Sequence, residues 1–168
     1  MASKRLWWHS FILVILLVGC QPEKQDSGSI SASGSIPQVE NIEDYLVTNI
    51  GISAFDGQVF CAYEPLNAQQ GAEGEIYLWA LCLEYYLEQE SLVPGSGISV
   101  PVALRIQEKN GHHEVIDHLV PRDGTYYGPD VRAIFPPSAW SQIYGYRGSE
   151  LEKDAEMKAR LYYDINTP

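Results

Sequence analysis

The sequence is poor in cysteine and in basic residues, and it lacks a hydrophobic run long enough for a transmembrane helix. It has three cysteines and no Cys-x-x-Cys motif, which argues against a redox function. The longest apolar stretch, residues 6–19, is shorter than the roughly 20 residues that a permanent membrane-spanning helix needs. Eleven Lys and Arg residues face 22 Asp and Glu residues, so the net charge is -11. Because an acidic chain repels phosphate backbones, we expect no nucleic-acid partner.

The motifs of several common enzyme classes are also absent. The sequence contains no Gly-x-Ser-x-Gly elbow, no phosphate-cradling glycine loop and no dinucleotide fingerprint. A glycosidase-type pair can be drawn between Glu84 and Asp117, but such a pair requires one buried carboxyl with a raised pKa. The sequence therefore favours a protein that is not an enzyme, and it predicts no catalytic residue, metal or cofactor.

Three histidines are the remaining candidates for a metal or catalytic site. A metal site needs three or four ligands that converge. His112 and His113 flank the Asn110-Gly111 turn, where polar side chains point into water, so a solvated hairpin tip accounts for them. His118 lies deeper in the same segment and could pair with a carboxylate, but a half-buried histidine with satisfied hydrogen bonds is the commoner outcome.

The N-terminus carries the most specific pattern. Residues 1–5 are basic, residues 6–19 are apolar, and this stretch runs into Leu17-Val18-Gly19-Cys20. The pattern resembles the lipobox of bacterial lipoproteins. In that family a peptidase cuts before the cysteine, whose thiol carries a diacylglycerol, and the new amine is often acylated with a fatty acid such as palmitate. The resemblance implies that residues 1–19 are a signal peptide and that Cys20 is the lipidation site.

The same resemblance places the remainder of the chain in the cell envelope. A lipid of two or more acyl chains gives stable attachment, so the membrane is a partner through Cys20. We expect an extracytoplasmic protein at the cell membrane or the outer membrane; Gln21, where an Asp commonly retains lipoproteins at the inner membrane, favours the outer one. Residues 20–37 read as the lipidated Cys and a Ser/Gly-rich tether that holds the domain on the order of 20–25 Å from its anchor. Without Lys4 and Arg5 of the leader, nine basic and 22 acidic residues give a net charge of -13.

Periodicity predicts one α+β domain over residues 38–168. A helix is expected at 38–50 and strands at 58–66, 75–88, 97–108 and 112–120, followed by loop-like chain after Pro121 and helices at 138–144 and 149–163. Asn110-Gly111 is a strong hairpin signal, and Pro101 predicts an edge or a bulge. The prediction is an N-terminal helix, a four-stranded antiparallel meander and C-terminal helical segments. This element order resembles that of cystatin-like and nuclear transport factor 2-like folds.

Cys61 and Cys82 each lie inside a predicted strand. If they face each other across an antiparallel pair, the centre of the hairpin falls at residues 71–72, where the sequence has turn character. This register permits a cross-strand disulfide in an export compartment. The alternative is two buried thiols that act as small hydrophobic groups, since Phe60, Leu81 and Leu83 adjoin them.

Tyrosine is the suggestive part of the composition, with 11 copies. Adjacent tyrosines in a strand point to opposite faces, which explains pairs such as Tyr85-Tyr86 without a ligand. The pair Tyr126-Tyr127 lies in a predicted loop, with Tyr144 further along the chain. These three form a candidate binding surface, because an apolar ring with a polar tip suits recognition of glycans or proteins.

Three hypotheses for function follow. The first is a lipid-anchored, non-enzymatic module that binds a protein or a cell-wall ligand. The second is an envelope hydrolase that uses carboxylates and His118 in a cleft of the sheet. The third is a cystatin-like inhibitor at the cell surface, which rests on the element order alone.

Overall fold

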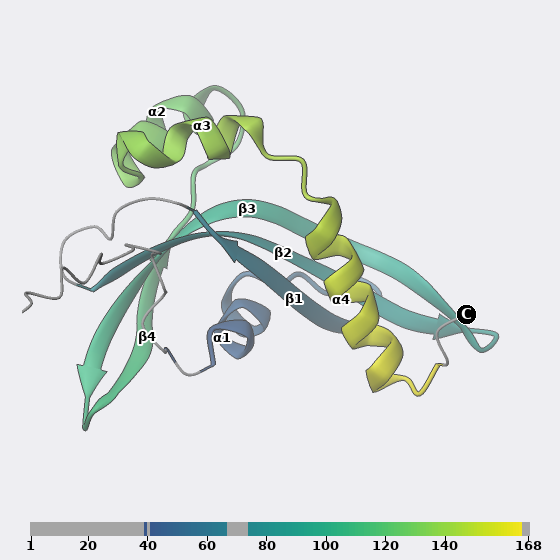
Figure 1. Ribbon diagram of the computed structural model, residues 1–168. Helices are drawn as coiled ribbons and strands as arrows, with labels where there is room; N and C mark the ends of the chain where they lie inside the picture. Colours follow the sequence, from purple (N-terminus) through teal and green to yellow (C-terminus); the bar gives the residue numbers. More distant parts are fainter. Residues whose placement is uncertain (1–38, 40, 67–73, 166–168) are drawn as a thin grey trace, which may run out of the picture. The chain divides into compact units, whose positions relative to one another are not determined.

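The computed structural model describes residues 39, 41–66 and 74–165 (Figure 1). The predicted signal peptide, Cys20 and the tether lie outside these residues. The elements are α1 (Ile42–Asn49), β1 (Gln58–Pro65), β2 (Glu75–Glu88), β3 (Ser91–Lys109), β4 (His112–Leu119), the short 3-10 helix η1 (Gly124–Tyr126), α2 (Tyr127–Ile134), α3 (Pro137–Gly145) and α4 (Ser149–Tyr162).

The four strands form one antiparallel sheet in the order β1-β2-β3-β4. The predicted α+β class, with its N-terminal helix, meander and C-terminal helical segments, is therefore confirmed. A bulge interrupts the pairing of β2 with β3 between Leu83 and Tyr85, and the sheet curves visibly in Figure 1.

Helices cover both faces of this sheet, which explains why β2 is apolar at almost every position. Ile76, Leu78 and Ala80 belong to the core that includes Leu46 of α1. The alternate residues Tyr77 and Trp79 belong to a second core, which is completed by buried residues of α2, α3 and α4. Because successive strand residues point to opposite faces, the domain has three layers, with α1 on one side and α2 to α4 on the other (Figure 1).

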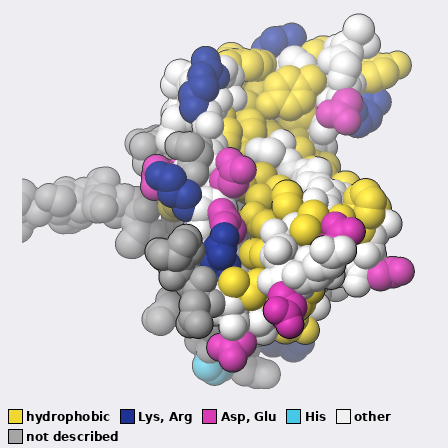
Figure 2. Space-filling model, turned by 90° about the vertical axis from the view of Figure 1, so that its right-hand side faces the viewer, with side chains coloured by type: hydrophobic (Ala, Val, Ile, Leu, Met, Phe, Trp, Pro, Cys, Tyr) yellow, Lys and Arg dark blue, Asp and Glu magenta, His cyan; other side chains and the backbone are white. Residues whose placement is uncertain are grey.

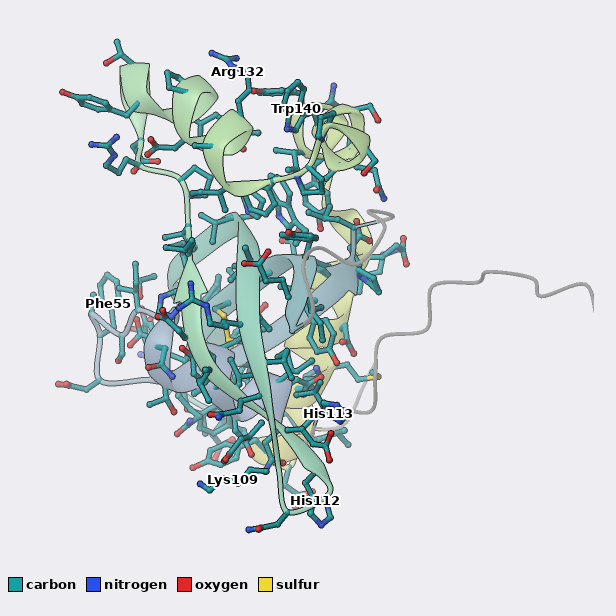
Figure 3. All side chains as sticks on the ribbon, turned by 90° about the vertical axis from the view of Figure 1, so that its left-hand side faces the viewer. Phe55, Lys109, His112, His113, Arg132 and Trp140 are labelled. Carbon is teal, nitrogen blue, oxygen red and sulfur yellow. A yellow bond between two sulfur atoms is a disulfide. The ribbon has the colours of Figure 1, made fainter. Side chains whose placement is uncertain are left out.

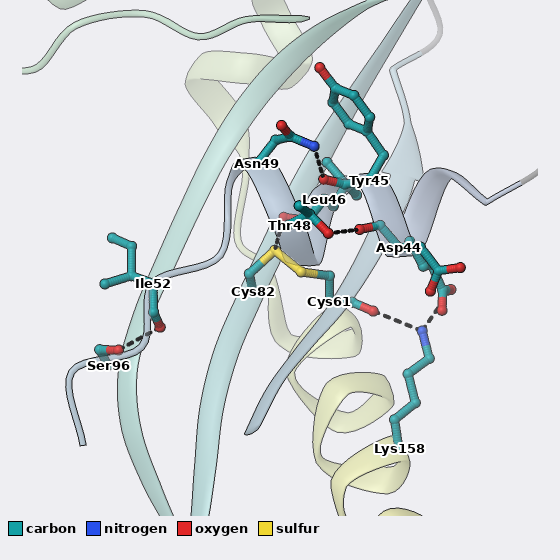
Figure 4. The surroundings of a disulfide bond; sticks show 11 residues. Asp44, Tyr45, Leu46, Thr48, Asn49, Ile52, Cys61, Cys82, Ser96 and Lys158 are labelled. Atoms are coloured by element: carbon teal, nitrogen blue, oxygen red, sulfur yellow. Dashed lines mark hydrogen bonds and ion pairs between the residues drawn. A yellow bond between two sulfur atoms is a disulfide. The ribbon is translucent and has the colours of Figure 1, made fainter. Parts of the chain in front are cut away.

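The predicted disulfide joins Cys61 and Cys82, which lie directly opposite each other in the β1–β2 register. Both residues are buried in the core beneath α1, and the Cys82 sulfur lies 3.9 Å from the Leu46 carbonyl oxygen (Figure 4). The predicted turn of this hairpin falls largely on residues 67–73, outside the described chain. Equal spacing of the two cysteines about that turn was thus sufficient to predict the pairing.

Lys158 of α4 links both helical layers around the edge of β1. Its ammonium donates to the Cys61 carbonyl oxygen at 2.9 Å and to the Glu43 carboxylate of α1 at 2.7 Å (Figure 4). Asp154 lies 3.1 Å from the same nitrogen. Burial opposes the charge, but the two carboxylates raise the pKa of Lys158 above its ordinary value. The ammonium therefore remains charged and ties α4, β1 and α1 together.

Apart from shifts of one residue, the elements differ from prediction in three places. The first helix begins at Ile42 rather than at residue 38, because Val39 instead forms a parallel bridge with His113 of β4. Strand β3 begins at Ser91 rather than at Gly97, since it pairs with β2 immediately after the turn. Residues 127–134, expected to be loop-like, form α2; its Pro129 is the third helical residue, where its missing N–H has no helical partner to lose.

Pro101 lies where the sheet has a free edge, as expected. β4 pairs with β3 only from Ala103 onward, so Pro101 adjoins β2 alone.

Candidate binding surface

A salt bridge fixes the start of the helical segment that carries the predicted binding tyrosines. Arg122 donates from Nε and Nη2 to the two carboxylate oxygens of Asp130, at 2.7 Å and 2.8 Å. The backbone N–H of Arg122 donates to the same carboxylate at 3.0 Å. These hydrogen bonds lower the pKa of Asp130 to about 2, so the pair stays ionised at neutral pH.

The same arginine orders the ring of Tyr126. The Arg122 guanidinium carbon lies 4.3 Å from the centre of the Tyr126 ring, a cation-π arrangement. Tyr126 nevertheless remains 57% exposed. One face of the ring is therefore supported while much of its surface is accessible to a ligand.

Tyr127 and Tyr144 meet as an edge-to-face pair with ring centres 6.4 Å apart. Tyr127 is half-buried at the start of α2, where burial raises its pKa, and Tyr144 on α3 is 50% exposed. We call Tyr126, Tyr127 and Tyr144 the aromatic surface. Figure 2 shows hydrophobic side chains at the upper end of the molecule, at the height of α2 and α3 in Figure 1, and also further down the same face. A role in binding stays a prediction for these residues.

His118 is a half-buried histidine with a hydrogen-bond partner, the commoner of the two outcomes expected from the sequence. Its Nδ1 lies 2.9 Å from the hydroxyl oxygen of Tyr45 on α1, and no described carboxylate bonds to its ring. Asp117 instead pairs with Arg105 at 3.3 Å. The contacts of His118 are those of a packed residue that joins β4 to α1, and they provide no acid–base pair for the hydrolase hypothesis.

The other two histidines lie apart from the aromatic surface. Figure 3 shows His112 and His113 toward the free end of the β3–β4 hairpin, with Arg132 of α2 and Trp140 of α3 at the opposite end. Within residues 39, 41–66 and 74–165, no three His, Cys, Asp or Glu side chains are placed to hold a metal ion.

Glu84 is a buried carboxylate whose structural role the sequence did not reveal. It is fully buried in β2, next to the bulge. One oxygen accepts from the hydroxyl of Ser53 and from the backbone N–H groups of Phe55 and Gly57, at 2.8–2.9 Å. The other accepts from the backbone N–H of Ala54 at 2.9 Å and from the N–H and hydroxyl of Ser96 at 3.1 Å and 2.7 Å.

Two glycines permit this close approach. A Cβ at Gly57 would lie 2.8 Å from Glu84 Cγ, and one at Gly95 would lie 2.8 Å from Glu84 Oε2. Glycine at both positions lets the two loops close on the carboxylate. Phe55, in the loop before β1 (Figure 3), is exposed and stacks on Tyr86 with ring centres 5.8 Å apart.

The ionisation of Glu84 is opposite to that of a general acid. Burial disfavours the charge, but the hydrogen bonds from Ala54, Ser96, Gly57 and Phe55 outweigh it and hold the pKa well below the ordinary range. A glycosidase acid requires a raised pKa instead. Glu84 therefore holds the loop at residues 53–57 and the segment at Ser96 in place, and it does not act as the acid of a pair with Asp117.

A hollow of about 420 Å³ lies where β1, α3 and the start of α4 meet. Its lining includes Glu64, Ser141, Gly145, Tyr146, Arg147 and Glu150. Tyr146 stacks on Trp79 with ring centres 3.9 Å apart, and its buried hydroxyl has no hydrogen-bond partner in the described chain. Burial and then the charge of Glu64 raise the pKa of Tyr146 to about 12. No local pattern predicts this hollow, because it forms from segments far apart in the sequence.

Comparison with known protein families, with curated proteins and with solved structures finds no match to this chain. The α+β fold is therefore described from its own geometry. Within the part of the chain that the structure describes, no helix has both the length and the apolar character needed to cross a membrane.

Proposed function

We propose that the chain is a lipid-anchored extracytoplasmic module that binds a protein or a cell-wall ligand through the aromatic surface. The observation that carries the proposal is the fixed presentation of this surface. Tyr126 is supported by Arg122, and Tyr144 by Tyr127, yet Tyr126 and Tyr144 are 57% and 50% exposed. Because ordered rings lose little conformational entropy on binding, they are efficient anchors for a ligand.

The disulfide supports the location outside the cytoplasm. A buried disulfide between Cys61 and Cys82 fits an oxidising compartment, to which the signal peptide would direct the chain. The N-terminal pattern at Cys20 supplies the anchor in this proposal. The acidic composition of the chain fits a domain that the lipid alone holds near the bilayer.

Mass spectrometry of the membrane-extracted protein tests the location. We expect an intact mass equal to residues 20–168 plus acyl chains, and a gain of two hydrogens on reduction. Cys20→Ala is expected to abolish both the acyl mass and membrane association. A wild-type mass that retains residues 1–19, or that lacks acyl chains, would refute the anchor.

Photo-crosslinking tests the aromatic surface in intact cells. A photoreactive phenylalanine at Tyr126 or Tyr144 is expected to give a discrete adduct with envelope protein or cell wall. The matched control is the same residue at Tyr162, a tyrosine on α4 that is 62% exposed. The double variant Tyr126→Ala/Tyr144→Ala is expected to lower binding of whichever partner is crosslinked at least about tenfold, as for two contact residues of more than 1 kcal/mol each. Equal adducts at all three positions, or unchanged binding, would assign the contact elsewhere.

A further inference from the structure

The hollow between β1, α3 and the start of α4 contains a half-buried carboxylate, Glu64, that has no partner among the described residues. Glu64 lies near the end of β1, opposite Trp79 in the register, on the sheet face that α2 to α4 cover. No described residue forms a hydrogen bond or an ion pair with it. A carboxylate removed from water without a counter-charge is unfavourable, so a cationic ligand would be stabilised there.

Two further charged side chains, Arg147 and Glu150, line the hollow. The Arg147 guanidinium donates from Nη1 to the Tyr146 carbonyl oxygen at 2.7 Å, and it lies in no described ion pair. Glu150 pairs with Lys153 of its own helix at 2.8 Å, in an exposed position. Glu64 is the half-buried charge of the hollow, whereas Arg147 and Glu150 are exposed and carry opposite charges.

An aromatic wall adjoins this carboxylate. Tyr146 lines the hollow and is held flat against Trp79, with 14° between the ring planes. Trp79 in turn donates from its indole N–H to the Ser99 hydroxyl at 2.9 Å, which fixes its orientation. A rigid aromatic ring beside a carboxylate is an arrangement that binds an ammonium on an apolar stem, because the ring contacts the methylenes and the carboxylate neutralises the ammonium.

We propose that this hollow binds a primary ammonium group on an alkyl chain, such as the side-chain amine of a lysine-type residue in a peptide, with Glu64 as its counter-charge. The volume of about 420 Å³ lies toward the small end of ligand sites, which fits a side chain with part of its backbone. An anion beside Tyr146 would be repelled by the half-buried Glu64, although the exposed Arg147 also lines the hollow. An uncharged apolar group would leave Glu64 desolvated without a counter-charge.

This inference deepens the proposed binding function and rests on it, since it names one chemical group that the ligand would carry. The two sites are tested separately. The aromatic surface is tested by crosslinking at Tyr126 and Tyr144, whereas the hollow is tested by small amines that need no native partner. If the crosslinking test fails, the amine titration can still be interpreted, and the reverse also holds.

The experiment is a chemical-shift titration of the full chain with Nα-acetyl-lysine amide, and in parallel with Nα-acetyl-norleucine amide, which lacks the ammonium. We expect the lysine probe to shift the amide signals of Gly145 and Gly148, and the norleucine probe to bind at least about tenfold more weakly. Glu64→Gln is expected to weaken lysine binding at least about tenfold. The matched control Glu108→Gln, at an exposed position on β3, makes the same change in net charge and is expected to leave binding unchanged.

A second variant removes space instead of charge. A Cβ at Gly145 would contact nothing within 4 Å, so Gly145→Leu adds a bulky side chain at the lining of the hollow without a clash and is expected to weaken lysine binding at least about tenfold. Circular dichroism of each variant checks its fold. Equal binding of the two probes would show an apolar hollow and overturn the proposal. Absence of lysine binding to the folded wild type, or equal loss in Glu64→Gln and Glu108→Gln, would overturn it as well.

Discussion

Replacing Glu84 with glutamine is expected to lower the melting temperature at pH 7 by on the order of 10 °C, because the change disrupts a buried hydrogen-bonded network. Glutamine keeps the size of the side chain but presents an NH2 group at one of the two oxygen positions. Each position faces backbone N–H donors, namely Phe55 and Gly57 at one and Ala54 and Ser96 at the other. Whichever way the amide is oriented, donors face donors and buried N–H groups lose their acceptor.

The effect has a defined pH dependence. The pKa of Glu84 is far lower in the folded state than the ordinary value of 4.5. Its contribution to folding is therefore fully present above about pH 4.5 and declines as the pH falls further, since the unfolded chain takes up the proton first. We expect the difference in melting temperature between wild type and Glu84→Gln to shrink as the pH is lowered from 5 toward 3.

Differential scanning calorimetry at several pH values measures both effects. Glu108→Gln again serves as the control, because it makes the same chemical change at an exposed residue and is expected to alter the melting temperature little. A Glu84→Gln variant as stable as this control at pH 7 would contradict the stabilising role of Glu84. So would a stability difference that grows on acidification.

Reduction of the Cys61–Cys82 disulfide is expected to lower the free energy of unfolding by about 3 kcal/mol. The bond closes a loop with a sequence separation of 21 residues, and its loss releases the unfolded chain. Both cysteines are buried within the core under α1, so the reduced thiols still fill their space and the fold is expected to persist. Urea denaturation with and without a reductant measures the change.

The double variant Cys61→Ala/Cys82→Ala separates the cross-link from other effects of the reductant. Its stability is expected to fall at least as far as that of the reduced wild type, because alanine also removes buried volume. Added reductant is expected to leave the variant unchanged. Equal urea midpoints for oxidised and reduced wild type would show that the bond adds no stability.

The sheet could be predicted from sequence because its information is local. Alternation of apolar residues located all four strands, and β2 was predicted at residues 75–88, as observed. The Asn110-Gly111 dipeptide marked the β3–β4 turn, and both residues adopt the left-handed φ that it requires, 56° and 81°. The spacing of Cys61 and Cys82 added the register of β1 on β2.

Elsewhere, local signals pointed away from the structure. Gly128-Pro129-Asp130 reads as a turn, but the first turn of a helix accepts proline, and the Arg122–Asp130 ion pair holds this segment in place. Because Pro94 and Gly95 are typical of turns, the strand was predicted to begin only at residue 97. The first residues of β3 are nevertheless held by their pairing with the end of β2.

The candidate sites divide in the same way. Exposed tyrosines could be selected by composition and by the predicted loop, whereas the contacts that order them required the fold. Glu84 had one visible signal, since it is an acid two residues after the inward-facing Cys82, but its partners come from two distant loops. The hollow beside Glu64 depends on how α3 and α4 meet β1, which no periodicity encodes.

The position of the Lys158 ammonium bears on how copies of this protein can associate. An uncovered outer strand is a template on which the strand of another copy can add, a route to fibrils. At the middle of β1 the Cys61 carbonyl oxygen is already bound by a cation that Glu43 and Asp154 hold in place. An incoming strand would have to break those contacts and leave the ammonium without its partners. Growth of edge-to-edge polymers through β1 is disfavoured as a result, even where many copies are crowded together.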